Sequence, residues 1–181
     1  GKPFLFTDCR VVDSSGNDVE PGVRGELIWR GDLLFSGYWQ NDAATQEVYK
    51  DGWVYSGDVG YRDEDGDIYV CDRTKNMYIS YGENIYPAEI EAVISMHPDV
   101  LDVCVIGIAD TVGLKGEVGK ALIVRRPDAT VKEDDLFAFF KEQLSSISRP
   151  QFIEFIGSIP KNSVGKRDLN AIRELYGNEE Q

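Results

Sequence analysis

The stretch YGENIYPAEIE, residues 81–91, passes from a tight turn through a short strand into the start of a helix. The turn pair Tyr81-Gly82 lies between two short segments of strand-forming residues, which predicts a small hairpin. Pro87 suits the first position of a helix, because the N–H that proline lacks would have no partner there. The apolar residues that follow recur at helical spacing. The sequence therefore predicts a hairpin followed directly by a helix over residues 87–94.

Glu89 and Glu91 belong to the opening of this helix. Carboxylates near a helix N-terminus interact favourably with the helix dipole. We therefore expect both residues to serve the dipole, and we assign neither of them a chemical role.

Beyond this helix, strands and helices alternate. The expected elements are strands over residues 100–108 and 118–125, a helix over 131–144, a strand over 152–155 and a helix over 168–176. A loop with two glycines is expected over residues 109–117. The order βαββαβα over residues 76–176 predicts a small α+β domain of about 100 residues, with a central sheet and flanking helices.

Upstream of the hairpin, short apolar runs alternate with turn residues, which is typical of antiparallel β structure. Residues 25–30 predict one strand. Residues 52–62 and 68–72 predict the two arms of a hairpin closed at Asp65-Gly66. A short helix is expected over residues 42–49.

The composition is that of a folded protein and argues against several kinds of partner. The chain has 181 residues, of which 42% are hydrophobic, and a formal net charge of −13. Such a surface repels phosphate backbones, so no nucleic-acid partner is expected. Basic residues nevertheless gather in the second half, where a local basic face can receive a small polyphosphate. No run approaches the roughly 20 apolar residues of a transmembrane helix.

The first residues, GKPF, include neither an initiator Met nor a signal-peptide pattern. We therefore expect a fragment of a longer protein. Cys9, Cys71 and Cys104 are odd in number and far apart, which favours reduced packing residues and a cytoplasmic location. His97 is the only histidine, so sites built on several histidines are excluded, and we expect it to cap a helix end.

Two motif-like stretches lack the residues that their chemistry requires. Residues 160–167, PKNSVGKR, have Pro where a Walker motif has its first Gly and Arg where it has Ser or Thr. Residues 63–67, DEDGD, lack the length and the terminal Glu of a calcium loop, so a solvated hairpin turn is expected. No metal site is predicted.

Four segments together resemble the adenylate-forming superfamily of acyl-CoA synthetases, peptide-synthetase adenylation domains and beetle luciferases. They are WVYSGD at residues 53–58, IYVCDRTK at 68–75, YGENIYPAEIE at 81–91, and the stretch from IP at 159–160 to GK at 165–166. Shorter matches upstream extend the resemblance over nearly the whole chain. The resemblance implies that the chain is the carboxyl-terminal portion of such an enzyme.

By this resemblance, Asp58 binds the ribose of ATP or AMP, and Arg73 reaches the ribose or a phosphate of the nucleotide. A carboxylate suits the first task because its two oxygens can accept both ribose hydroxyls. Taken alone, Asp58 would be interpreted as a turn-capping residue and Arg73 as an exposed charge at a strand end.

Lys75 falls where the resembling enzymes have a hinge, about which a small domain swings between two orientations. The resemblance thus predicts a β-rich end of a large domain over residues 1–73 and a small, mobile, α+β carboxyl-terminal lid domain over 74–181. On residue type alone, Lys75 is one more surface lysine.

Lys166 corresponds to the lysine that acts in adenylation in the resembling enzymes, and it is expected to contact ATP. Joining a carboxylate to the α-phosphate brings two anions together, and a fixed ammonium lowers that barrier. By the same resemblance, Tyr81 and Gly82 are expected to bind coenzyme A, because they occupy the hairpin that lines its channel in the resembling enzymes, where a glycine permits close approach. Arg167 departs from the pattern, since an aliphatic residue commonly follows the lysine. The loop before Glu117 also looks longer than is typical.

The resulting hypothesis is an acyl-CoA synthetase that uses ATP, Mg²⁺ and coenzyme A to activate a carboxylic acid, with a preference for medium- or long-chain fatty acids. The phosphate-binding loop and the acyl pocket would lie upstream of residue 1, in a missing amino-terminal domain, so the chain alone is expected to be inactive. Two alternatives stay open. One is a ligase that loads an acyl or aminoacyl group onto a carrier protein, and the other is a noncatalytic nucleotide-binding module.

Overall fold

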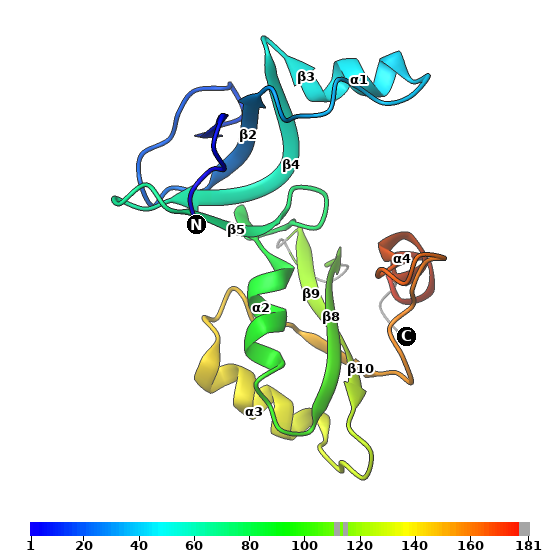
Figure 1. The fold of residues 1–181 in the computed structure, drawn as a ribbon. Helices are drawn as coiled ribbons and strands as arrows, with labels where there is room; N and C mark the ends of the chain where they lie inside the picture. Colours follow the sequence, from blue (N-terminus) through cyan, green and yellow to red (C-terminus); the bar gives the residue numbers. More distant parts are fainter. Residues whose placement is uncertain (111–112, 114–115, 178–181) are drawn as a thin grey trace. The chain divides into compact units, whose positions relative to one another are not determined.

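The computed structural model describes residues 1–110, 113 and 116–177. The chain divides into two compact units, Gly1–Lys75 and Asn76–Gln181, each with its own sheet (Figure 1). The loop expected over residues 109–117 lies partly outside the described residues, so the expectation that it is longer than is typical stays a prediction.

The first unit is an antiparallel sheet with one short helix. The strands run in the order β1-β2-β4-β3, and β5 also pairs with β4, along residues 58–62. The strands are β1 (Thr7–Val12), β2 (Gly25–Gly31), β3 (Tyr49–Lys50), β4 (Trp53–Arg62) and β5 (Ile68–Arg73). Helix α1 (Asp42–Val48) begins after Asn41, whose side chain accepts the Ala44 N–H at 3.1 Å. Figure 1 shows β4 as a long, curved strand, and this strand pairs with β2, β3 and β5.

The second unit is a three-stranded sheet with helices on both faces. Strands β8 (Val100–Ala109) and β9 (Glu117–Arg125) are antiparallel, and β10 (Phe152–Phe155) adds to β9 in parallel. Helices α2 (Pro87–Ile94) and α3 (Glu133–Gln143) cover one face, and α4 (Leu169–Tyr176) lies on the other (Figure 1). A separate hairpin consists of β6 (Tyr78–Ser80) and β7 (Glu83–Ile85).

Strand alternation builds two cores in the second unit. On β8, Val103 and Val105 face the core that contains Phe140 of α3. Cys104, between them, faces the opposite core with Ile172 of α4. Successive side chains of a strand point to opposite faces, so β8 contributes to both cores. Because the sheet is buried on both faces, its strands have almost continuously apolar sequences.

A pair of glycines fixes the small hairpin to this sheet. Gly107 and Gly119 lie opposite each other in the β8–β9 register. The ring of Tyr78, from β6, packs where their side chains would be: a Cβ at Gly107 would lie 2.3 Å from the Tyr78 Cβ, and one at Gly119 would lie 2.5 Å from its hydroxyl oxygen. The glycines therefore allow the buried Tyr78 to anchor the turn that follows it.

The α+β class and the expected order of elements are confirmed, with small shifts at the ends. The helix expected over 131–144 spans Glu133–Gln143 because Asp135 caps it, accepting the Lys132 N–H at 3.0 Å. The last helix begins at Leu169 because Asp168 is its cap. His97 lies beyond the end of α2 at Ile94, and its Nδ1 accepts the Asp99 N–H at 3.2 Å, which stabilises the turn before β8 rather than capping the helix.

Candidate functional site

The first unit brings Asp58 and Arg73 together. Asp58 on β4 lies directly opposite Arg73 on β5 in the antiparallel register. Arg73 Nε lies 3.0 Å from Asp58 Oδ1, and the two side chains are 56% and 30% exposed, respectively. A ligand can therefore reach both groups. The Asp58 carboxylate can accept hydrogen bonds from hydroxyl groups, and the adjacent Arg73 guanidinium can bind a phosphate.

Backbone contacts fix the position of Asp58. Ser56 Oγ donates to the Leu27 carbonyl at 2.7 Å and accepts the Asp58 N–H at 3.0 Å. The Gly57 N–H donates to Glu26 Oε1 at 3.0 Å. Since these contacts join β4 to β2, the Asp58 carboxylate is placed by the sheet rather than by a loose turn.

Lys75 is exposed and is the last residue of the first compact unit. It follows β5 in a turn over residues 74–76. The chain therefore passes from one unit to the other at this point, within the stretch where the hinge is predicted. Both the hinge motion and the domain limits stay predictions.

Lys166 lies on a tight hairpin, residues 161–167, which precedes α4. Lys161 and Arg167 form an isolated antiparallel bridge at its base. The Asn162 N–H donates to the Lys166 carbonyl at 2.8 Å, and Asn162 Oδ1 accepts the Lys166 N–H at 3.0 Å. The Lys166 side chain is exposed, and its ammonium has no hydrogen bond or ion pair in the part of the chain that the structure describes. A firmly held backbone thus presents an available cation.

Arg167 ties this hairpin to the sheet and to α2. Its Nη1 lies 2.7 Å from Glu91 Oε2, and its Nη2 lies 2.9 Å from Asp102 Oδ1. The expectation that Glu91 serves the dipole of α2 is therefore wrong. Glu89 is the acidic residue of the first turn, whereas Glu91 lies beyond that turn and pairs with Arg167.

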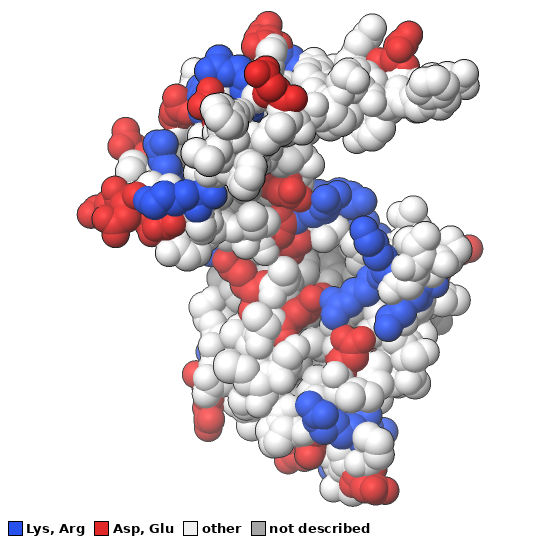
Figure 2. Space-filling view, viewed as in Figure 1, with Lys and Arg blue, Asp and Glu red and all other residues white. Residues whose placement is uncertain are grey.

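Basic and acidic side chains lie next to each other over this part of the second unit. On the face seen in Figure 2, Lys and Arg side chains gather between the three-stranded sheet and α4, with Asp and Glu side chains directly beside them. Burial lowers the pKa of the Arg167 guanidinium, but the nearby acidic groups, Glu91 foremost and Asp102 with it, together outweigh this effect and leave the pKa raised. Arg167 is therefore a permanent cation.

Tyr81 and Gly82 form the two-residue turn between β6 and β7, which confirms the predicted hairpin. Their φ angles, +52° and +80°, both lie in the left-handed region, as a type I′ turn requires. A Cβ added at Gly82 would meet nothing within 4 Å. The second unit therefore leaves the outer side of this turn open to a ligand.

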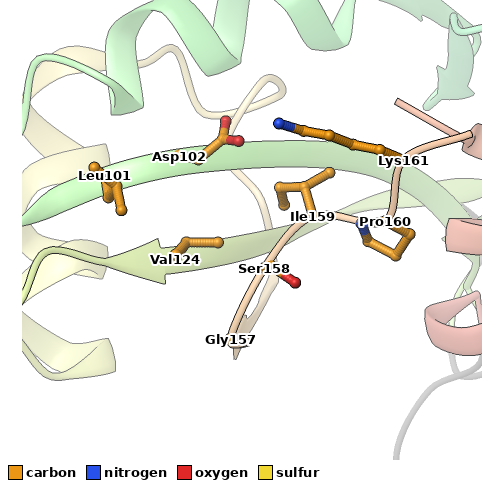
Figure 3. Close-up of a pocket in the computed structure, with 8 residues that line it drawn as sticks. All are labelled: Leu101, Asp102, Val124, Gly157, Ser158, Ile159, Pro160 and Lys161. Carbon is orange, nitrogen blue, oxygen red and sulfur yellow. The ribbon is translucent and has the colours of Figure 1, made fainter. Parts of the chain in front are cut away.

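An open hollow lies beside the base of the Lys166 hairpin. It measures about 620 Å³ and lies between the start of β8, the end of β9 and residues 157–161. Its walls include the apolar Leu101 and Val124, and Figure 3 shows the side chains of Asp102 and Lys161 pointing toward one another across it. Asp102 thus borders the hollow while it also pairs with Arg167.

The described residues include no group of three or more His, Cys, Asp or Glu side chains that could hold a metal ion. Among the same residues, no helix combines the length and the apolar character needed to span a membrane.

Comparison with known proteins places these features in a family. Residues 89–166 match the family described as AMP-binding enzyme C-terminal domain. The chain is 41% identical over 177 residues to feruloyl-CoA synthase from Amycolatopsis sp, covering 98% of this chain and 36% of that protein. It is 39% identical over 166 residues to long-chain-fatty-acid–CoA ligase from Escherichia coli O157:H7, covering 92% of this chain and 29% of that protein.

The fold agrees with a solved relative. The o-succinylbenzoate CoA synthetase from Bacillus subtilis, in complex with an acyl-adenylate intermediate, matches with a TM-score of 0.90 and 31% identity, over 99% of this chain and 36% of that one. The same enzyme has also been solved with ATP and a magnesium ion, and that structure matches with a TM-score of 0.85 and 32% identity over 92% of this chain and 34% of that one. The chain belongs to the adenylate-forming, AMP-binding superfamily. It spans about a third of the length of the relatives that it matches.

In this member of the superfamily, the sequence indicated Lys166 but not the residues that support its hairpin. Arg167 was visible as a departure from the usual aliphatic residue. Its partners were not, because Glu91 and Asp102 lie 76 and 65 positions away in the sequence. Only the packing of α2 and β8 brings these carboxylates to the hairpin.

Proposed function

We propose that the chain is the carboxyl-terminal part of an ATP-dependent acyl-CoA synthetase. A carboxylic acid and ATP would give acyl-AMP and pyrophosphate, and coenzyme A would then displace AMP to give acyl-CoA. The observation that carries this proposal is the exposed ammonium of Lys166 on a firmly bonded hairpin. It lies at the end of the segment that matches the AMP-binding C-terminal family.

Lys166 would act by electrostatics. In the adenylation step, an acid carboxylate attacks the α-phosphate, and negative charge accumulates on the oxygens between them. An ammonium fixed at that position stabilises the transition state more than the separated reactants, which lowers the barrier. The backbone bonds to Asn162 support this role, because they hold the cation in place before the reaction begins.

Asp58 and Arg73 would hold the nucleotide. The Asp58 carboxylate would accept the ribose hydroxyls, while the adjacent guanidinium would contact the ribose or a phosphate oxygen. Since the described residues offer no cluster of metal ligands, Mg²⁺ would be held by the phosphates of ATP rather than by this part of the chain.

The turn at Tyr81 and Gly82 would serve the second half-reaction. Its open outer side gives the pantetheine arm of coenzyme A access to the backbone. Rotation about Lys75 would move the Lys166 hairpin away from the acyl-adenylate and bring this turn to it.

For the acid, we propose a medium- or long-chain fatty acid, on the basis of Lys75 at the hinge and the sequence of residues 82–87. Aromatic acids compete with this assignment, because one relative is named for feruloyl-CoA. We also propose a cytoplasmic location, since Cys9, Cys71 and Cys104 form no disulfide in the described structure.

The test is ATP–pyrophosphate exchange by the complete protein that carries this chain, with decanoate, palmitate, ferulate and 2-succinylbenzoate as acids. We expect Lys166→Ala to lower the exchange rate at least about 100-fold, as expected for a fixed electrostatic group. Lys161→Ala is the matched control, since it removes an exposed lysine from the same hairpin, and it should stay within about twofold of the parent. Equal rates for Lys166→Ala and the parent would refute the assignment.

The same panel separates the alternatives. Acyl-CoA formation supports the synthetase, whereas exchange without acyl-CoA would favour a ligase that loads a carrier protein. Binding of ATP without exchange for any acid would favour a noncatalytic module.

A further inference from the structure

The Lys166 hairpin is supported at its base, next to the lysine itself. Residues 161–166 are all exposed, and the hydrogen bonds of Asn162 close the loop on itself rather than on the domain. The hollow of Figure 3 separates residues 157–161 from the start of β8 on one side. The direction of the hairpin therefore depends on contacts made where it meets the domain.

Arg167 makes such a contact with two elements at once. One guanidinium nitrogen bonds to Glu91 of α2 at 2.7 Å and another bonds to Asp102 of β8 at 2.9 Å. A planar guanidinium that bonds to two carboxylates is held in both position and orientation, whereas a point charge would be held by distance alone.

The two carboxylates are themselves fixed. Glu91 Oε1 accepts the Val105 N–H at 2.8 Å, and Asp102 Oδ1 accepts the Val103 N–H at 2.9 Å. The side chain of Glu91 is only 16% exposed. Because each acceptor is bonded to a backbone N–H of β8, neither can follow a displaced arginine without losing that hydrogen bond.

We propose that Arg167 is a positioning residue for the adenylation step: its two ion pairs set the direction in which the Lys166 ammonium leaves the domain. The inference rests on the proposed function of Lys166. It assigns Arg167 no contact with substrate, and it explains why a charged residue is accommodated at a position where the family commonly has an aliphatic one.

The kinetic test uses the complete protein and separates the two half-reactions. We expect Arg167→Met to lower the maximal rate of ATP–pyrophosphate exchange about 10- to 100-fold, because a displacement of about 1 Å costs that much. The KM for ATP and the rate of thioester formation from a synthetic acyl-adenylate should both stay within about twofold of the parent. Arg167→Lys, which keeps one ion pair, should give an intermediate exchange rate.

Two comparisons make this result specific. Arg149→Met removes another arginine that fastens a loop, through bonds to the Leu144 and Lys141 carbonyls at 3.0 Å each, and it should leave exchange unchanged. In a Lys166→Ala background, Arg167→Met should cause no further loss, since the cation that it positions is gone. Equal loss in both half-reactions, or an additive loss in the double variant, would overturn the proposal.

Hydrogen–deuterium exchange on the 181-residue chain tests the anchor without any acid substrate. In Arg167→Met, we expect the Asp168 amide, which donates to the Pro160 carbonyl at 3.0 Å across the base of the hairpin, to exchange at least about tenfold faster, while the amides of β8 and β9 keep their protection. Should this variant fail to fold, Asp102→Asn removes one pair at a half-exposed site. Unchanged protection of the hairpin in both variants would refute the anchor. Failure of Lys166→Ala alone would instead refute the proposed function.

Discussion

At the scale of single residues, the Asp58–Arg73 pair matters for what it leaves accessible rather than for stability. An ion pair between side chains this exposed contributes about 0–1 kcal/mol to the free energy of unfolding. Both groups are held by opposite positions of β4 and β5, so the pair is placed even without a ligand. The two side chains that we propose to contact the nucleotide are therefore in place before it binds.

We predict that Asp58→Asn raises the KM for ATP of the complete protein about 10- to 100-fold, since a charged acceptor of the ribose hydroxyls is lost. The free energy of unfolding of the chain should change by less than about 1 kcal/mol. Steady-state kinetics and urea denaturation measure the two effects. Asp18→Asn, which removes another exposed partner of an arginine, is the control for charge. Equal KM values for the two variants would contradict the assignment.

Cys104 makes the second unit sensitive to alkaline pH. Burial, with the Glu91 carboxylate nearby, raises the pKa of its thiol from 9.0 to about 12. A group with a raised folded-state pKa stabilises the fold fully below its unfolded-state pKa, and this contribution is lost as pH rises through the folded-state value.

The urea midpoint of the chain should therefore fall between about pH 9 and pH 12, as the unfolded chain gains a thiolate that the folded chain resists. Cys104→Ala should flatten this fall, although it lowers the midpoint at pH 7 because a buried side chain is shortened. A fall of the same steepness in both proteins would show that Cys104 is not responsible.

At the scale of elements, the packing of Tyr78 on two glycines links the central sheet to the turn proposed for coenzyme A. The hairpin is short, and two isolated strands are marginal without packing against a larger element. Tyr78 supplies that packing, and Ile79 adds a bond from its N–H to Glu117 Oε2 at 3.1 Å. The packing of the hairpin on β8 and β9 therefore determines the position of Gly82.

Gly107→Ala should lower the free energy of unfolding of the chain by about 1–3 kcal/mol, because the new methyl group would overlap the Tyr78 Cβ, an atom close to the backbone. Gly157→Ala is the matched control, since a Cβ there meets nothing within 4 Å. Urea denaturation of both variants checks the difference. A loss no greater than that of the control would mean that the hairpin shifts at no cost.

At the scale of the whole molecule, the chain consists of two units that meet in sequence at an exposed stretch. Arg73, Thr74 and Lys75 are all exposed, and the compact units divide directly after them. Exposed connections between compact units are preferred sites of proteolysis.

Limited trypsin digestion of the chain should therefore cleave first after Arg73 or Lys75, and mass spectrometry should find two fragments that resist further digestion. Replacing both residues by Gln should slow this first cleavage at least about tenfold, while cleavage at other sites continues. First cleavage inside either unit would contradict the division.

The sequence alone carries the elements and most of the chemistry. The hairpin at Tyr81 and Gly82, the helix after Pro87 and the order of strands and helices depend on local periodicity, turn residues and caps, which neighbouring residues determine. Lys166, Asp58 and Arg73 were recognisable because they lie in motifs that resemble those of the adenylate-forming superfamily. Their roles stay predictions until they are measured.

Tertiary structure decided which residues support the chemical groups. Nothing local connects Arg167 with Glu91 and Asp102, or Tyr78 with Gly107 and Gly119, since these partners come from distant elements whose contact depends on how helices and strands pack. The sequence specifies which side chain stands at each position. The direction in which it is held depends on long-range burial and pairing, which exist only once the chain has folded.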